Sequence, residues 1–267
     1  MTHRVHFGFK SEPFTNEIQT KDLLKLPNMV GVKERFDYCL KLGGVMTVTG
    51  EVGAGKSTSM RWALSAHHPS ELHAVEIVAT TGAIAEFYRQ LAWGLDIVPR
   101  AGSRVSLMNE AKEAIKDFAT VKKQKVAVVV DEAQLLRREV MTELHTLLNF
   151  DHDSKNHMSL VLCGQSTVLE SLQNRTAAAL RSRVMTKATL RNLTPVEMEE
   201  YLNHHLRVAG VKRPLFEPAA VTAIHQGSAG VLRHANHLAS GGLVAAAIEK
   251  KDTVTAEHIR IAASELI

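Results

Sequence analysis

The sequence has few of the features that mark secreted or membrane-spanning proteins. Cysteine occurs only at Cys39 and Cys163, too far apart in the chain to suggest a disulfide framework or a zinc site, and this favours a reducing compartment. No run of 18 uncharged apolar residues is present, and the first residues lack the apolar core of a signal peptide. We therefore expect a cytoplasmic protein with no membrane partner.

Aromatic residues are also scarce, and no charge of one sign dominates. Aromatics make up 5% of the 267 residues, whereas hydrophobic residues make up 45%, enough to bury a large core in one domain, alone or with a small helical one. The net charge of +4 and the pI of about 9.1 are compatible with a polyanionic partner without requiring one. The fourteen histidines are scattered, which argues against a metal site built from them.

A glycine-rich turn between a strand pattern and a helix pattern is the most specific feature present. Gly50, four further residues and then Gly55-Lys56-Ser57 match the P-loop at every fixed position. Glycines let backbone N–H groups approach phosphate oxygens, and the helix that follows adds its positive N-terminal end. The alternative is a glycine-rich strand-to-helix turn followed by a chance Lys-Ser pair, which the strand before it and the helix after it disfavour, so we expect ATP binding. The predicted contacts are Gly50, Glu51, Val52, Gly53, Ala54, Gly55, Lys56, Ser57 and Thr58.

A buried strand that ends in two carboxylates is the second strong pattern. Residues 126–130 are small or β-branched, which predicts a parallel strand covered on both faces. Asp131 and Glu132 follow at its carboxyl end, where ligands of open α/β sheets bind. In this Walker B pattern, Asp131 and Ser57 hold Mg²⁺ and Glu132 polarises the attacking water. The alternative is an acidic start to the next helix, but with the P-loop the pattern predicts Mg²⁺-dependent ATP hydrolysis.

The order of predicted elements indicates an α/β fold followed by helices. Strands and helices alternate up to residue 193, which predicts a parallel sheet flanked by helices, entered through a loop-rich lead-in at residues 1–31. Thr194-Pro195 is a helix N-cap followed by proline, and only helices are expected after it. We therefore predict two domains, an α/β nucleotide-binding domain at 1–193 and a helical lid at 194–267.

Three phenylalanines lie close together in the lead-in, at Phe7, Phe9 and Phe14. They either cover a nucleotide base or fill the edge of the core. The sequence favours neither.

Polar and basic residues near later strand ends are further candidates. Gln165 follows a predicted strand and either senses the γ-phosphate or caps the next helix. Arg175, Arg181 and Arg183 precede the last strand, and their forked, permanent charge suits the phosphates of a neighbouring subunit, although at least one can be a solvated surface residue. Arg233, near the start of the third lid helix, is expected to turn toward the phosphates.

Two basic groups are candidate contacts to a DNA backbone. Arg100 and Arg104 flank a predicted loop, and Lys122, Lys123 and Lys125 follow a predicted helix. Such clusters are usually solvated helix ends, and phosphate contacts from them carry little sequence information.

Together, the P-loop, Asp131-Glu132, the polar strand end, the late arginines and the helical lid resemble the AAA+ ATPase family over nearly the whole chain. Within it the sequence resembles the ExeA branch, which includes secretion ATPases and helpers of DNA transposition similar to the TnsC, TniB, IstB and MuB groups. The stretches that carry this resemblance are Phe7-Gly8-Phe9, Pro13-Phe14, residues 50–57, Asp131-Glu132-Ala133-Gln134 and Leu162-Cys163-Gly164-Gln165. The resemblance implies that Gln165 is sensor 1, Arg233 sensor 2 and Arg183 the arginine finger, with Arg181 as its alternative.

The secretion proteins of this branch continue into a membrane span and a peptidoglycan-binding module, whereas this sequence ends at Ile267, just after the lid. We therefore expect a regulator of transposition that forms ATP-dependent rings or filaments on duplex DNA, selects a target and recruits or stimulates a transposase. The first alternative is a secretion- or envelope-type ATPase that acts on protein partners. The second is a small-molecule P-loop kinase, which Asp131-Glu132 and the helical lid disfavour.

Overall fold

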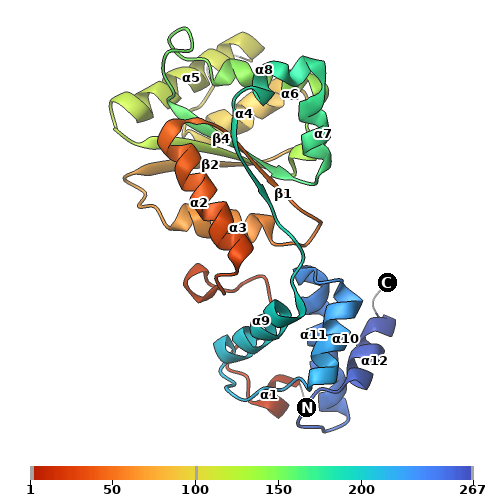
Figure 1. Ribbon diagram of the computed structural model, residues 1–267. Helices are drawn as coiled ribbons and strands as arrows, with labels where there is room; N and C mark the ends of the chain where they lie inside the picture. The colour runs from red at the N-terminus through yellow and green to blue at the C-terminus, as the bar shows by residue number, and fades with distance from the viewer. Residues whose placement is uncertain (1–2, 100–101, 266–267) are drawn as a thin grey trace. The chain divides into compact units, whose positions relative to one another are not determined.

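A computed structural model describes residues 3–99 and 102–265 (Figure 1). The described chain divides into two compact units. The α/β unit contains residues 27–51 and 56–190, and the helical unit contains residues 3–26, 52–55 and 191–265. In the described part of the chain, no helix combines the length and the apolar character needed to cross a bilayer.

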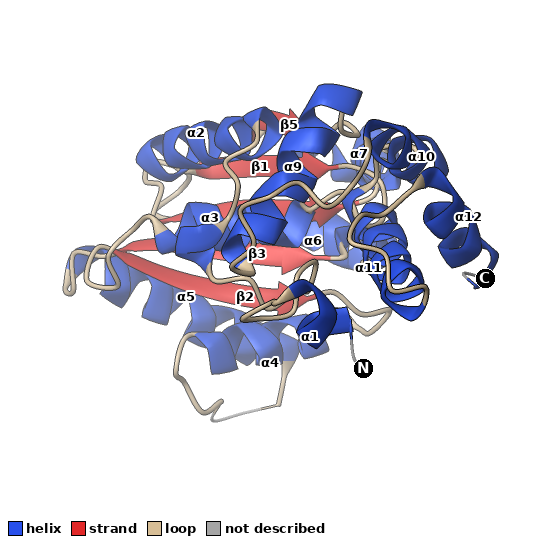
Figure 2. Cartoon of the chain, turned by 90° about the horizontal axis from the view of Figure 1, so that it is seen from below, coloured by secondary structure: helices blue, strands red, loops and turns tan. Residues whose placement is uncertain are grey.

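A five-stranded parallel sheet forms the centre of the α/β unit, in the order β2-β3-β4-β1-β5 (Figure 2). The strands are β1 (Gly44–Thr49), β2 (Leu72–Val78), β3 (Lys125–Asp131), β4 (Met158–Gly164) and β5 (Val184–Thr189). Register pairs Thr49 with Gly164 and Val130 with Leu162, so β1, β4 and β3 end at the same edge. This confirms the predicted fold class and brings the ends of the two motif strands to either side of β4.

Helices cover both faces of this sheet. They are α2 (Pro27–Leu42), α3 (Lys56–Ser65), α4 (Ile84–Gly94), α5 (Arg104–Thr120), α6 (Arg138–Leu147), α7 (Thr167–Gln173) and α8 (Ala178–Arg181). Val126, Val128 and Val130 of β3 face the apolar cluster that contains residues of α4, α5 and α6. The intervening Ala127 and Val129 are also buried, which explains why the strand has no polar alternation.

The helical unit contains α9 (Pro195–Val208), α10 (Pro218–Ser228), α11 (Leu232–Ile248) and α12 (Ala256–Glu265), together with the short helix α1 (His3–Phe7). The predicted N-cap is confirmed, because Thr194 and Glu197 form a reciprocal capping box at the start of α9. Arg191 binds the same carboxylate, and this ion pair lowers the pKa of Glu197 to about 2.

The lead-in belongs to the helical unit, and this corrects its predicted place in the α/β domain. Residues 3–26 group with α9–α12, and Phe7, Phe9 and Phe14 are all buried there. The ring of Phe14 stacks on His205 of α9, with centroids 5.2 Å apart. The aromatics thus form part of a core, which is one of the two roles that the sequence leaves open.

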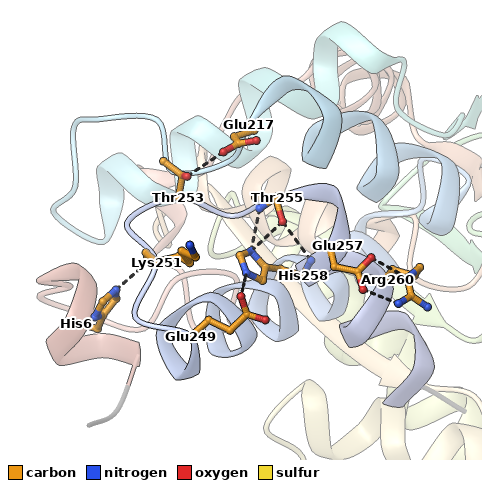
Figure 3. Close-up of polar contacts among 9 residues, drawn as sticks. All are labelled: His6, Glu217, Glu249, Lys251, Thr253, Thr255, Glu257, His258 and Arg260. Atoms are coloured by element: carbon orange, nitrogen blue, oxygen red, sulfur yellow. Dashed lines mark hydrogen bonds and ion pairs between the residues drawn. The ribbon is translucent and has the colours of Figure 1, made fainter.

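Two histidines, His6 of α1 and His258 of α12, make polar contacts to the segment that connects α11 to α12 (Figure 3). A ring nitrogen of His6 lies 2.8 Å from the carbonyl of Lys251. The buried His258 accepts the backbone N–H of Thr255 at Nδ1, so its proton is on Nε2, which lies 3.2 Å from a carboxylate oxygen of Glu249. The ring therefore stabilises the start of α12 and joins it to the end of α11.

Candidate nucleotide-binding site

The P-loop joins β1 to the N-terminus of α3. Gly53 and Gly55 have φ values of +85° and +92°, a backbone conformation that side-chain-bearing residues rarely adopt. Lys56 is the first residue of α3 and is buried, and its ammonium donates to the carbonyls of Gly50 and Glu51 at 3.0 and 2.8 Å. These bonds hold the Lys56 ammonium against the backbone of the loop, and P-loops bind phosphate at this position.

The P-loop serine and the Walker B aspartate are in direct contact. Ser57 Oγ donates to Asp131 Oδ2 at 2.7 Å, and Asp131 Oδ1 accepts the backbone N–H of Glu132 at 2.9 Å. A hydroxyl and a carboxylate oxygen side by side form a suitable donor set for Mg²⁺, which prefers oxygen ligands and binds through few protein groups. The residues present therefore fit the predicted metal.

Glu132 has an unusual backbone conformation. Its φ of 52° and ψ of 35° are left-handed, and it precedes the short 3₁₀ helix η2 (Ala133–Leu135). For a residue other than glycine this conformation costs on the order of 1 kcal/mol or more, so surrounding contacts must hold it. The hydrogen bond from the Glu132 backbone N–H to Asp131 is one such contact. The Glu132 side chain itself is exposed, just past the end of β3.

Gln165 lies between the two motifs, because it follows β4 and β4 is flanked by β1 and β3. Its backbone N–H donates to the side-chain oxygen of Gln134 at 3.1 Å. Its carbonyl accepts the backbone N–H of Val168 at 3.0 Å in the first turn of α7, so the helix-cap alternative stays open beside the sensor role. Gln134 has no predicted role in the sequence, and spacing alone gives no signal that it reaches this strand end.

Burial makes both cysteines unreactive. It raises the pKa of the Cys39 thiol to about 11, and it raises the pKa of the Cys163 thiol further, with the nearby Asp131 carboxylate adding to the effect. Neither side chain is a thiolate near neutral pH. Chemistry at this edge of the sheet therefore rests on oxygen and nitrogen groups.

The candidate arginine finger lies at the opposite edge of the sheet. Arg183 directly precedes β5, whose Val184 pairs with Val45 near the start of β1, and a strand the length of β1 spans roughly 20 Å. Its guanidinium binds both carboxylate oxygens of Asp153 at 2.8 Å. Arg181 is exposed and donates to the carbonyl of Gln173, and Arg175 is also exposed. Arg183 therefore lies too far from the P-loop of its own chain to contact its phosphates.

Arg233 is the second residue of α11 in the helical unit. Its backbone N–H donates to the carbonyl of Gly53 at 3.2 Å, both residues being in that unit. A Cβ on Gly53 would lie 2.6 Å from the Cβ of Arg233. The glycine therefore also provides space for α11.

The candidate DNA contacts do not form one cluster. Arg104 begins α5 and pairs with Glu143 at 2.7 Å, whereas Lys122 and Lys123 follow its C-terminus and Lys125 begins β3. A helix of 17 residues is about 25 Å long, so the two groups lie at its opposite ends. The ammonium of Lys122 lies 3.6 Å from the ring centroid of Phe118. Arg100 lies outside the described residues.

Comparison with known proteins gives a distant curated relative. The chain is 28% identical to general secretion pathway protein A of Aeromonas hydrophila over 97% of its own length. It spans 48%, about half, of that relative.

Solved structures share the fold at low sequence identity. Cdc6p of Pyrobaculum aerophilum aligns with a TM-score of 0.73 at 16% identity, covering 95% of this chain and 70% of that one. The Aeropyrum pernix ORC1 protein in complex with DNA aligns with a TM-score of 0.70 at 16% identity, and the alignment covers 99% of this chain and 69% of that one. The Thermotoga maritima RuvB Holliday junction branch migration motor aligns with a TM-score of 0.56 at 16% identity, and the alignment covers 90% of this chain and 68% of that one. These likenesses show an AAA+ P-loop NTPase fold.

A family model described as an AAA domain matches residues 40–173, which include the P-loop, Asp131 and Glu132. The chain therefore belongs to the AAA domain family, whose members bind nucleotide, usually with Mg²⁺, and in general hydrolyse it.

Proposed function

We propose that the chain is a Mg²⁺-dependent ATPase whose nucleotide state controls its assembly on duplex DNA in a transposition reaction. The observation that carries the ATPase part is the chain of contacts from Ser57 through Asp131 to Glu132. Through the Asp131 side chain, it joins the P-loop to the backbone of the residue that carries the proposed catalytic carboxylate.

Each residue at the site has a separate task in this proposal. Residues 50–58 surround the phosphates, and Lys56 leaves the loop carbonyls to contact their terminal oxygens. Ser57 and Asp131 hold Mg²⁺, which when bound neutralises negative charge on the phosphates. Glu132 accepts a hydrogen bond from the attacking water, and Gln165 contacts the γ-phosphate.

The proposal includes oligomerisation, because the arginine-finger role needs it. Because Arg183 and Arg181 lie across the sheet from their own P-loop, a finger role requires a second copy of the chain. In the assembly Arg183 exchanges Asp153 for the phosphates of the neighbouring subunit, and Arg233 acts as sensor 2 toward the nucleotide.

Three observations support the DNA part of the proposal. The branch that the motifs resemble includes transposition helpers, the solved structures of similar fold include an ORC1 protein in complex with DNA, and Arg104 and the lysines 122, 123 and 125 are exposed. The secretion-type alternative has support of its own, because the curated relative is general secretion pathway protein A. The two proposals share the ATPase and differ in the partner.

Electron microscopy with a slowly hydrolysed ATP analogue, with and without duplex DNA, separates them. We expect rings or filaments that require both ligands, and DNA affinity that falls steeply with salt because phosphate contacts release counterions. Lys56→Ala, which should bind nucleotide more weakly, is the matched control and should assemble less. Assembly that is indifferent to DNA would support the secretion-type alternative, and a persistent monomer would contradict the arginine-finger role.

A further inference from the structure

The side chain of Gln134 joins two separate parts of the nucleotide site. Its Nε2 lies 2.5 Å from a carboxylate oxygen of Glu132, and its Oε1 lies 3.1 Å from the backbone nitrogen of Gln165. One amide therefore contacts both the proposed catalytic carboxylate and the strand end that carries the proposed γ-phosphate sensor.

Hydrogen-bond chemistry fixes the orientation of this amide. The backbone N–H of Gln165 can only donate, so the oxygen of Gln134 must face it. The carboxylate of Glu132 accepts, so it must face the NH₂ group. The opposite orientation would break both bonds, which leaves one arrangement.

Gly164 provides the space in which the amide lies. A Cβ at this position would be 2.4 Å from Gln134 Oε1 and 2.7 Å from a methyl group of Val168, closer than real Cβ atoms approach other atoms. The φ of Gly164 is not in the left-handed region, so backbone conformation does not explain the glycine. The glycine is explained instead by the close approach of the Gln134 amide, which leaves no room for a side chain.

We propose that Gln134 is a positioning residue that holds the Glu132 carboxylate in its reactive place and couples it to Gln165. This inference rests on the proposed role of Glu132 as the group that polarises water. The backbone of Glu132 is left-handed and its side chain is exposed, so the carboxylate needs an external contact to keep one orientation. The bond to the Gln165 backbone lets a change at the γ-phosphate reach that carboxylate through a single side chain.

We call the two side-chain hydrogen bonds of Gln134, to Glu132 and to Gln165, the Gln134 bridge. Two variants with similar side-chain volume test it. Gln134→Glu keeps an acceptor for the Gln165 N–H but loses the donor to Glu132, and Gln134→Met loses both without adding charge. Gln124→Met is the matched control, because Gln124 donates one side-chain bond to the carbonyl of Pro69, at the start of β3 and away from the strand ends that carry the motifs.

We expect both Gln134 variants to lower kcat by about 10- to 100-fold, because small misplacement of a catalytic group has effects of that size. Their affinity for a fluorescent ATP analogue should stay within about twofold of the parent, and their melting temperature should match that of Gln124→Met. Combining Gln134→Met with Glu132→Gln should lower kcat no further than Glu132→Gln alone, since the two residues act as one unit.

Parental kcat in either Gln134 variant would overturn the inference. So would a parallel loss of folding or of ATP affinity in both, because that would make the bridge structural. Parental hydrolysis in Glu132→Gln would instead contradict the proposed catalytic role of Glu132, and this result is distinguishable from the others.

Discussion

The two units use polar side chains in different ways. In the α/β unit one group of polar side chains gathers at one edge of the sheet, where Ser57, Asp131, Glu132 and Gln134 bond to one another and remain partly exposed. In the helical unit, polar rings such as His205 lie inside the core. The first arrangement leaves groups available for ligands, whereas the second stabilises packing. We therefore expect substitutions at this sheet edge to affect activity, and substitutions of the buried rings to affect stability.

The largest effect on activity apart from the catalytic carboxylate is expected at Arg183. If it is the arginine finger, Arg183→Ala should lower kcat of the assembled protein by roughly 10³-fold, the lower end of the range for such residues. Steady-state ATP hydrolysis above the assembly concentration measures this. Asp153→Ala is the matched control, because it removes the same ion pair but leaves the guanidinium, and it should keep near-parental activity.

Equal losses in Arg183→Ala and Asp153→Ala would show that the ion pair itself is needed, and the finger role would fail. A selective loss in Arg181→Ala would move the finger to that residue.

A smaller effect, on stability alone, is expected at His205. Burial, together with the neighbouring His204, lowers the pKa of His205 to about 4. Below the ordinary histidine pKa the unfolded chain binds a proton that the folded chain excludes, so stability falls as pH drops from about 6.5 to about 4. The loss should total about 3 kcal/mol, by the conversion of roughly 1.36 kcal/mol per pKa unit.

Urea unfolding at pH 7 and pH 4.5 measures this loss. His205→Phe keeps an aromatic ring against Phe14 and should flatten the pH dependence, whereas His234→Phe, an exposed site on α11, should retain the parental slope. An unchanged slope in His205→Phe would locate the acid sensitivity elsewhere.

Local patterns predicted most of the α/β unit. The β-branched run of β3 and the glycine spacing after β1 are patterns of neighbouring residues, and both motif strands lie where these patterns place them. The start of α9 at Thr194-Pro195 was also predictable, because an N-cap followed by proline is a pattern of adjacent residues. The predicted loop-rich lead-in at residues 1–31 overlaps the first turn of α2, which begins at Pro27, although proline in a first turn is a known start signal.

Contacts between distant segments could not be predicted. Phe14 packs on His205 from a lead-in with no regular apolar period, so the sequence did not show which unit it joins. The Gln134 bridge and the Arg183–Asp153 pair also depend on how loops fold back, which spacing does not encode.

The most direct test of the account is ATP hydrolysis by Glu132→Gln, measured together with ATP binding. The account predicts ATP affinity near that of the parent and hydrolysis reduced by roughly 10²- to 10⁴-fold, the usual contribution of a general base. It also predicts that any ATP-dependent assembly persists, because bound ATP is no longer consumed. Hydrolysis at the parental rate would contradict the assignment of Glu132 as the catalytic carboxylate.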